Sequence, residues 1–182
     1  RGSHQTQIAM IWTPHVSVAA IIERDGKFLF IEEESGGARV FNQPAGHWEP
    51  GETLLDATVR EALEEAACHF VPQHLVGVYS WRHAASDITY VRFAYCGDIT
   101  GFDVNRKLDT GIVGTTWMSA EALRAHGLER LRSPLVLSQA TMALMPMGPR
   151  VPSPVRNSLK IRRAVSASLG SISKRFFVRW PR

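Results

Sequence analysis

The spacing of apolar residues in the first part of the chain predicts a β-hairpin and a further extended segment. Residues 16–22 form a continuous run of small apolar and β-branched side chains, as expected for a buried strand. A turn at Asp25-Gly26 separates this run from a second apolar run at 28–31. Residues 40–48 are also expected to be extended, with an interruption near the end where a proline and a glycine occur.

A helical period replaces the strand pattern at residues 53–67. Further strands are predicted at 76–81, 89–99 and 112–117. Two short helices are predicted at 120–126 and 134–145, the first with Ser119 as N-cap and the second with Ser133 as N-cap before a proline. Because strands occur before, between and after the helices, the order predicts a layered α/β domain with a mixed β-sheet.

Composition divides the chain into one globular domain and two terminal segments. The 182 residues are 45% hydrophobic and 21% charged, which is ordinary for a globular protein. The domain is placed at 8–148, because several prolines from residue 146 onward prevent any helix from continuing. Residues 1–7 begin Arg-Gly-Ser-His without a methionine and are expected to be vector-derived or disordered. Residues 149–182 form a basic tail rich in Pro, Ser and Arg, which is expected to be disordered.

The formal net charge of +4 is a property of the tail. Of the 21 Lys and Arg residues, eight lie in 151–182, which has no acid, so 13 bases face all 17 acids in 1–150. The body of the protein is therefore acidic, and the overall basic balance gives no reason to expect nucleic acid as its partner. A tail that docks on anionic lipid or RNA is the alternative to a disordered one.

Three features favour a cytoplasmic protein. No apolar run reaches the roughly 18–20 residues of a membrane span. The N-terminal part shows no basic-then-apolar export signal. Cys68 and Cys96 lie far apart and match no zinc or redox spacing, so a reducing compartment is their simplest environment.

The predicted helix at 53–67 carries three carboxylates on one side. At about 100° per residue, Glu65 lies about 40° from Glu61 in one direction and Glu64 about 60° in the other. These like charges repel one another and lie near the negative end of the helix dipole. A divalent cation such as Mg²⁺, which takes oxygen ligands, would compensate for that cost. A solvated acidic face, partly neutralised by Arg60, is the alternative.

The segment before this helix is suited to a metal site. Residues 43–46, Gln-Pro-Ala-Gly, force a tight backbone with few side chains, so main-chain oxygens can reach a metal there. Residues 50–52 turn the chain into the helix, and Glu52 is well placed to pair with Arg60. The arrangement brings a backbone carbonyl and the helical carboxylates to one place.

Residues 46–68 resemble the Nudix box, G-x5-E-x7-R-E-U-x-E-E-x-G-U, in which U is a bulky aliphatic residue. The residues at the required spacing are Gly46, Glu52, Arg60, Glu61, Glu64 and Glu65. Two positions depart from the pattern: Ala62 stands at the first U, and Ala67 stands where the closing glycine belongs. That glycine normally takes a left-handed cap, and an alanine there costs roughly 1 kcal/mol. Cys68 at the final U is acceptable as a small hydrophobe.

The resemblance covers about residues 14–145 and is closest to the bacterial NudJ-type phosphatases of the Nudix family. It implies a Nudix-type α/β/α sandwich with a mixed β-sheet, and attack of water on a diphosphate that depends on Mg²⁺, with Mn²⁺ as a substitute. For the NudJ type it implies release of orthophosphate from nucleoside di- and triphosphates, and from hydroxymethylpyrimidine or thiamine diphosphate. The expected partner is therefore a small-molecule diphosphate.

The resemblance also assigns roles to single residues. Those expected to hold one to three Mg²⁺ or Mn²⁺ ions are Glu61, Glu64, Glu65 and the carbonyl of Ala45. Glu64 or Glu61 is expected to take the proton of the attacking water, while Arg60 orients Glu52 and the helix. Asp109, ahead of the strand at 112–117, is a candidate remote base, with a plain turn residue as the alternative.

Five further residues are candidates for contacting the substrate. Trp48 and Trp81 are placed to stack on a pyrimidine or purine, although Trp81 at a strand end fits the core equally well. Gln43 and His47 flank the metal site and are candidates to reach phosphate or base. Arg92 lies in the middle of a strand, so its side chain points either into the cleft as a phosphate clamp or out to solvent.

Two other functions remain open. An ADP-ribose or nucleotide-sugar pyrophosphatase would use the same box but release two phosphomonoesters and no orthophosphate. A Nudix-like binding module without catalysis would use the basic tail to recruit RNA or a membrane, but it would have no need to crowd the carboxylates. The protein is expected to be a monomer or a homodimer.

Overall fold

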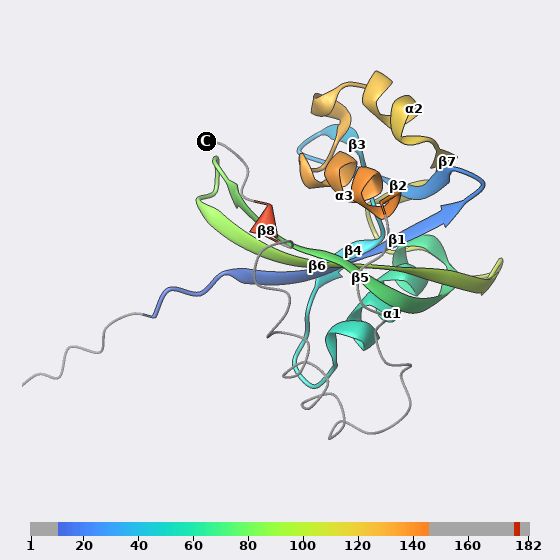
Figure 1. Ribbon diagram of the computed structural model, residues 1–182, viewed down its shortest axis with the longest axis horizontal. Coiled ribbons are helices and arrows are strands. Elements are labelled where there is room, and N and C mark those ends of the chain that lie inside the picture. The colour runs from blue at the N-terminus through green and yellow to red at the C-terminus, as the bar shows by residue number, and fades with distance from the viewer. Residues whose placement is uncertain (1–10, 146–176, 179–182) are drawn as a thin grey trace, which may run out of the picture.

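A computed structural model describes residues 11–145 and the short segment 177–178 (Figure 1). The strands are β1 (His15–Arg24), β2 (Lys27–Ser35), β3 (Ala38–Asn42), β4 (Ala45–His47), β5 (Cys68–His83), β6 (Ile88–Phe102), β7 (Ile112–Met118) and β8 (Phe177–Val178). The helices are α1 (Leu54–Ala66), α2 (Ala120–Ala125), the 3-10 helix η1 (Leu128–Arg130) and α3 (Leu135–Ala143).

Strand β1 is shared by the two wings of a mixed sheet. The strand order is β3-β2-β1-β6-β5-β8, with β4 paired to β1 and β7 paired to β2. β1 runs parallel to β6 and antiparallel to β2 and β4. Residues 17–19 of β1 pair with β4, whereas residues 23–24 pair with β2, so the two wings separate along β1. The mixed sheet that the sequence predicted is confirmed.

Helices cover both faces of the sheet (Figure 1). Because successive residues of a strand point to opposite faces, β1 contributes to two separate cores. Ala20 packs with Ala62 in the core beneath α1, whereas Ala19 belongs to the opposite core with Val136 of α3. The molecule is therefore a sandwich with α1 on one side of the sheet and α2 and α3 on the other, as the family resemblance implied.

The local elements follow the sequence closely, with three differences in the strands. The hairpin turn is present, with Asp25 and Gly26 both at positive φ, which the turn between two twisted strands requires. The extended segment at 40–48 is broken at 43–44, because Pro44 has no N–H to donate to a ladder. Strands β5 and β6 extend well beyond the predicted 76–81 and 89–99, because they pair with each other along almost their whole length.

The two short helices differ in their caps. Ser119 caps α2 as expected, since its hydroxyl accepts the Ala122 N–H at 3.1 Å. The expectation that Ser133 caps α3 is wrong: the helix begins at Leu135, and Pro134 before it is already in a helical conformation without a capping side chain. Instead, the Ser133 side chain is buried, and only its carbonyl accepts the Val136 N–H, at 3.2 Å.

The prediction of a disordered basic tail at 149–182 can be compared with the structure only at residues 177–178. Residues 177–178 form β8, which runs parallel to residues 78–79 of β5 at the edge of the sheet. The rest of the tail, and residues 1–7, lie outside the described residues. Within the described part of the chain, no helix has both the length and the apolar character needed to cross a bilayer.

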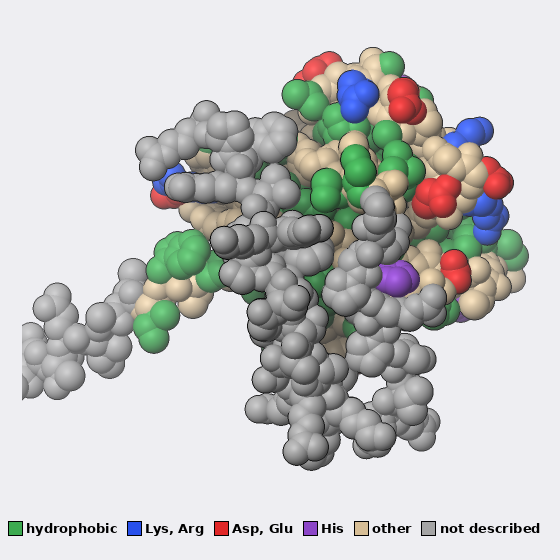
Figure 2. All heavy atoms as spheres, viewed as in Figure 1, with side chains coloured by type: hydrophobic (Ala, Val, Ile, Leu, Met, Phe, Trp, Pro, Cys, Tyr) green, Lys and Arg blue, Asp and Glu red, His purple; other side chains and the backbone are tan. Residues whose placement is uncertain are grey.

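Several exposed apolar side chains lie in and next to η1 and α3. In Figure 2, hydrophobic side chains are grouped over this part of the molecule, with charged side chains toward its rim. The larger ones are Leu128, Met142, Leu144 and Met145.

Candidate active site

Helix α1 is held at both ends by local interactions. Thr53 is its N-cap: the Thr53 hydroxyl accepts the Asp56 N–H at 3.1 Å, and the Asp56 carboxylate accepts the Thr53 N–H at 3.2 Å. At the other end, Ala67 takes the left-handed conformation with φ 51° and ψ 27°, and its N–H reaches the Leu63 carbonyl at 3.0 Å. The alanine therefore adopts the cap that the Nudix pattern gives to glycine, and the register of the carboxylates on α1 is preserved.

Glu61 is the most buried carboxylate of the helix, at 7% exposure. It lies directly against Gly46 of β4, where a Cβ atom would overlap the Glu61 carboxylate. Burial raises the pKa of Glu61, whereas hydrogen bonding and charge from Arg60 lower it, and Glu64 and Asp109 raise it further. The glycine at the start of the box thus makes room for a carboxylate that carries an electrostatic cost.

Arg60 connects the box loop to the helix. It donates from Nε to Glu52 Oε2 at 3.0 Å and from Nη2 to Glu52 Oε1 at 2.8 Å, which is a bidentate ion pair. Its Nη1 reaches Glu61 at 2.8 Å and Glu64 at 3.0 Å, and its Nη2 donates to the His47 carbonyl at 3.0 Å. These contacts, with Glu52 first, raise the pKa of Arg60, and the Arg60 hydrogen bond lowers that of Glu52. The pairing of Glu52 with Arg60 that the sequence predicted is present.

Glu65 reaches back to the segment before the box. Its Oε2 accepts the N–H of Ala45 at 2.7 Å, so it contacts the residue whose carbonyl was the predicted backbone ligand. Burial raises the pKa of Glu65 to about 8, the Ala45 hydrogen bond lowers it, and the charges of Glu61, Glu33 and Asp109 raise it. The carboxylates of α1 therefore lie in a region of excess negative charge that a cation would relieve.

Two acidic residues outside the box join this region. The Asp109 N–H donates to the Glu64 carbonyl at 3.1 Å, which holds the loop before β7 against α1. Glu33 of β2 interacts electrostatically with Glu65. The sequence singled out Asp109 but missed Glu33, whose signal was hidden in the acidic run 32–34 at the end of an apolar strand.

The carboxylate oxygens have the chemistry that Mg²⁺ and Mn²⁺ prefer. Glu61 and Glu65 are substantially buried and share neighbouring charges, and Gly46 makes room for the Glu61 carboxylate on the β4 side. Among the described residues, no three His, Cys, Asp or Glu side chains are arranged around one point as metal ligands, and Arg60 holds Glu61 and Glu64 in this structure. The donor set fits a hard divalent cation, with Arg60 as the positive group that now neutralises it.

Aromatic side chains gather on the opposite face of the sheet. Trp81 stacks on Tyr90 with ring centres 6.0 Å apart, and Tyr90 contacts His15 at 5.5 Å and His47 at 6.2 Å. Partial burial lowers the pKa of His47, with smaller contributions from His15 and Arg92. The sequence singled out Trp81 and His47 but missed His15 and Tyr90, because the parallel register of β1 and β6 that joins them is not visible in the sequence.

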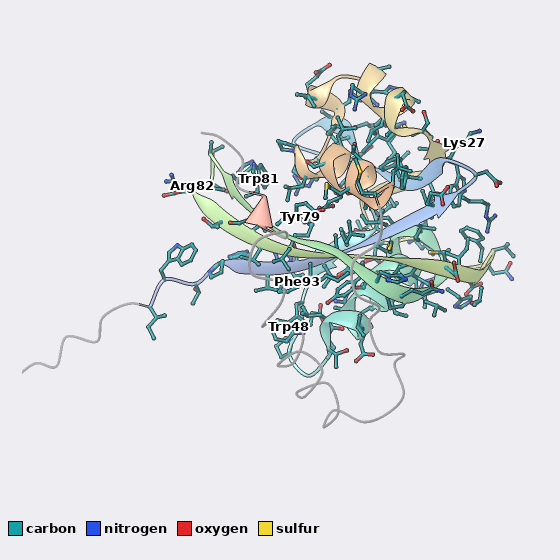
Figure 3. The ribbon with its side chains drawn as sticks, in the orientation of Figure 1. Lys27, Trp48, Tyr79, Trp81, Arg82 and Phe93 are labelled. Carbon is teal, nitrogen blue, oxygen red and sulfur yellow. The ribbon has the colours of Figure 1, made fainter. Side chains whose placement is uncertain are left out.

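Trp48 does not join this aromatic group. Figure 3 shows Trp48 beside α1 and Trp81 on the other side of the sheet, as expected from the alternation of His47 and Trp48 along the chain. The Trp48 indole is 47% exposed and donates to the Glu52 carbonyl at 2.8 Å. The two tryptophans are therefore not arranged to hold one heterocycle between them.

Arg92 points into the molecule. It lies on the same face as Tyr90, opposite Ser17 of β1, and donates to Ser17 Oγ at 3.3 Å and Asn42 Oδ1 at 3.4 Å. Burial lowers the pKa of Arg92 to about 10, while the charges of Glu65 and Glu33 raise it. Arg92 thus connects the aromatic face electrostatically to the carboxylates. Gln43 is also buried, and its Nε2 donates to the Val136 carbonyl at 2.7 Å.

Comparison with known proteins agrees with the fold and the box. The NUDIX domain profile matches residues 13–138. The chain is 38% identical over 127 residues to Phosphatase NudJ of Escherichia coli (strain K12), covering 69% of this chain and 80% of the relative. It is 45% identical, with a TM-score of 0.69, to the solved structure of a NUDIX hydrolase from Nitrosomonas europaea, covering 72% of this chain and 88% of that one.

More distant solved structures share the fold. An ADP-ribose pyrophosphatase from Streptococcus suis is 18% identical with a TM-score of 0.58, covering 74% of this chain and 94% of that one. A bifunctional NMN adenylyltransferase/ADP ribose pyrophosphatase from Francisella tularensis, solved with AMP and a Mn ion, is 15% identical with a TM-score of 0.57, covering 75% and 42%.

The protein belongs to the Nudix family. Within the family it is a Nudix hydrolase, an enzyme that acts on phosphorus-containing anhydride bonds, and its relatives include NudJ phosphatases.

Proposed function

We propose that this protein is a Mg²⁺-dependent phosphatase that releases orthophosphate from nucleoside di- and triphosphates, and from hydroxymethylpyrimidine or thiamine diphosphate. The observation that carries the proposal is the gathering of Glu61, Glu64 and Glu65 on α1 beside Ala45 and Gly46. The similarity to NudJ phosphatases over 69% of the chain supports the choice of phosphate as product.

The metal ions would be held by Glu61, Glu64, Glu65 and the Ala45 carbonyl, with Mn²⁺ able to replace Mg²⁺. Such ions would neutralise charge on the leaving phosphate and make the attacking water more acidic. The protein prepares these ligands by burying Glu61 and Glu65 and by compensating Glu61 and Glu64 with Arg60.

The remaining polar residues have distinct tasks in this proposal. Glu64 or Glu61 would take the proton from the attacking water, and the proposal is supported by the position of both carboxylates beside Arg60 Nη1 on α1. Arg60 acts as a positioning residue, since its bidentate pair with Glu52 fixes the box loop against α1. Asp109 is placed to act as a remote base, because its loop is hydrogen-bonded to α1 at Glu64.

The organic group of the substrate would lie on the aromatic face. Trp81 and its stacked partner Tyr90 offer flat surfaces there, and His47 lies at their edge. Arg92 would bind a phosphate oxygen, since it lies between these rings and the carboxylates. Gln43 lies deeper on the same side, whereas Trp48 would contact only the part of the ligand near the box loop.

We also propose a cytoplasmic location and a monomeric or homodimeric state. Cys68 is buried and forms no disulfide with another described residue, which suits a reducing compartment. A small-molecule diphosphate is the expected partner, and any contact with nucleic acid would have to come from the basic tail.

Product analysis tests the proposal directly. Purified protein is incubated with GTP, GDP, thiamine diphosphate and ADP-ribose, with Mg²⁺, with Mn²⁺ and with EDTA, and orthophosphate and organic products are quantified. Orthophosphate from the first three substrates, abolished by EDTA, is the expected result. Two phosphomonoesters from ADP-ribose and little orthophosphate from any substrate would replace the proposal by a pyrophosphatase. Metal-independent ligand binding without turnover would indicate a binding module.

A further inference from the structure

Several buried amide and hydroxyl atoms at helix α3 have no hydrogen-bond partner among the described residues. Gln139 is 0% exposed, and neither its Oε1 nor its Nε2 has a hydrogen-bond partner among the described residues. The same holds for the Oε1 atom of Gln43, which is 1% exposed, and for the hydroxyl of Ser133, which is 5% exposed. These four atoms are polar atoms in a largely apolar core, and none of them forms a hydrogen bond with another described residue.

The three residues belong to one place in the structure. The Gln43 Nε2 atom donates to the carbonyl of Val136, and Gln139 follows one helical turn later on the same buried face of α3. Ser133 precedes the helix and bonds through its carbonyl to the Val136 N–H. The buried face of α3 packs on β1 and β5, which is the side of the sheet that carries Tyr79 and Arg92.

Keeping these groups buried is costly. A buried donor or acceptor without a partner destabilises a protein, and an apolar side chain of similar shape would avoid this cost. Leucine, for example, would fill the Gln139 position in the core formed by Val136 and Ala140. The polar groups therefore need an explanation other than packing.

Helix α3, which covers these groups, lacks the usual side-chain and charge interactions at its ends. No side chain caps its N-terminus, its first turn has no acidic residue, and its last turn has no basic residue. Capping and dipole interactions that usually stabilise a helix end are thus missing from α3. The position of α3 over Gln43 therefore rests on the packing of its buried face, which includes Val136 and Ala140.

We propose that Gln43 and Gln139, with the Ser133 hydroxyl, recognise the hydrogen-bonding edge of a planar nitrogen heterocycle on the substrate. An amide presents one donor and one acceptor side by side, which matches the adjacent donor and acceptor of an aminopyrimidine or an adenine edge. The inference rests on the proposed function, because it assumes a diphosphate at the carboxylate site. With the phosphates near Arg92, the heterocycle lies against Trp81 and Tyr90 with its polar edge toward α3.

The test compares one variant on two substrates. Gln139→Leu removes both hydrogen-bonding atoms with little change in volume, and its kcat/KM is measured on ADP and on benzyl diphosphate. Benzyl diphosphate keeps the phosphoanhydride and a flat ring but has no hydrogen-bonding edge. We expect kcat/KM to fall by about tenfold or more for ADP and to stay within about twofold for benzyl diphosphate. We also expect Tm to rise, because a buried amide without a partner is removed.

Gln73→Leu is the matched control, because this glutamine lies on β5 and bonds to Asp98 away from α3. It is expected to leave the ratio of the two kcat/KM values unchanged. If Gln139→Leu fails to fold, Gln43→Met tests the same ratio from the sheet side. Equal losses on both substrates, or an unchanged ratio with a raised Tm, would overturn the proposal; the second result would mean that the amides only bind buried water.

Binding separates this inference from the proposed function. ADP binding to the wild type and to Gln139→Leu is measured by calorimetry in EDTA, where turnover is not required. Weaker binding by the variant together with no hydrolysis of either diphosphate would support recognition and reject the phosphatase. Hydrolysis of both diphosphates with unchanged ADP binding and an unchanged kcat/KM ratio would support the phosphatase and reject recognition by Gln139.

Discussion

Gly46 of β4 and Glu61 of α1 are in such close contact that a Cβ atom on the glycine would overlap the glutamate carboxylate. The two residues are brought together because β4 ends beside the middle of α1. The missing side chain of Gly46 therefore makes the space that the Glu61 carboxylate occupies beside β4.

A methyl group at position 46 should affect activity more than stability. In Gly46→Ala, the overlapping atoms are the end of a flexible side chain, so Glu61 can rotate away at modest cost to the fold. We expect kcat to fall by about tenfold or more, with Tm changed by only a few degrees. Gly101→Ala is the control, since a Cβ there meets nothing within 4 Å. Full activity in Gly46→Ala would mean that the position of Glu61 is not important.

Removing the charge of Glu61 tests its role as ligand or base. Glu61→Gln keeps the shape of the side chain and its contact with Gly46, so the fold should be retained by circular dichroism and Tm. We expect kcat with Mg²⁺ to fall by roughly two orders of magnitude or more, as for the loss of a central electrostatic group. Turnover close to that of the wild type would refute the role assigned to Glu61.

The ion pair between Glu52 and Arg60 should show coupling in a double-mutant cycle. Both side chains are partly buried, with 16% and 25% of their surface exposed, so we expect a coupling free energy of only about 1 kcal/mol. The variants are Glu52→Gln, Arg60→Lys and the double variant, compared by urea unfolding. Lysine should not rescue the contact, because it lacks the fork that bonds both oxygens. Additive effects of the two single variants would argue against the pair as the link between loop and helix.

Ala67 carries backbone strain that glycine would relieve. It lies at φ 51°, a conformation that costs an L-residue roughly 1–2 kcal/mol. We expect Ala67→Gly to stabilise the protein by about 0.5–1 kcal/mol, since glycine also loses more freedom on folding. Ala66→Gly, in the last residue of α1, should do the opposite. Unfolding midpoints in urea measure both, and destabilisation by Ala67→Gly would contradict the strained cap.

Cys68 should make the stability depend on alkaline pH. Burial raises the pKa of the Cys68 thiol from 9.0 to about 11, and the thiol is 3.4 Å from the Ala62 carbonyl that it donates to. A raised pKa means that the contribution is complete below pH 9 and is lost as the pH rises toward 11, because the unfolded chain ionises first. We expect the stability advantage of the wild type over Cys68→Ala to shrink by about 1–2 kcal/mol between pH 7.5 and 10.5.

Unfolding free energies of both proteins across this pH range provide the measurement. Cys68→Ala has no ionisable group at this position. It is therefore the reference that removes the effects of the other titrating groups from the wild-type curve. A difference between the two proteins that does not vary with pH would show that the thiol is not desolvated.

The chain itself determined the elements and the local part of the site. Thr53 and Asp56 form the capping box, and Glu61, Glu64 and Glu65 share one side of α1, because both features depend on residues within two helical turns. The prediction that Ser133 caps α3 failed. The sequence there has the usual pattern of a helix N-cap, but the Ser133 side chain is buried in the folded protein and does not cap the helix. Sequence rules for helix caps consider neighbouring residues only, so they miss the tertiary packing that orients a side chain such as Ser133.

Only the folded structure placed distant residues beside one another. The charge of Glu33 on β2 raises the pKa of Glu65 on α1, although the two residues are far apart in the sequence. Tyr90 contacts His15 because β6 runs parallel to β1. Gln43 meets the Val136 carbonyl only because α3 packs on the sheet. The physical reason is that hydrophobic periodicity specifies which face of an element is buried, whereas strand register and helix docking specify which buried residues meet.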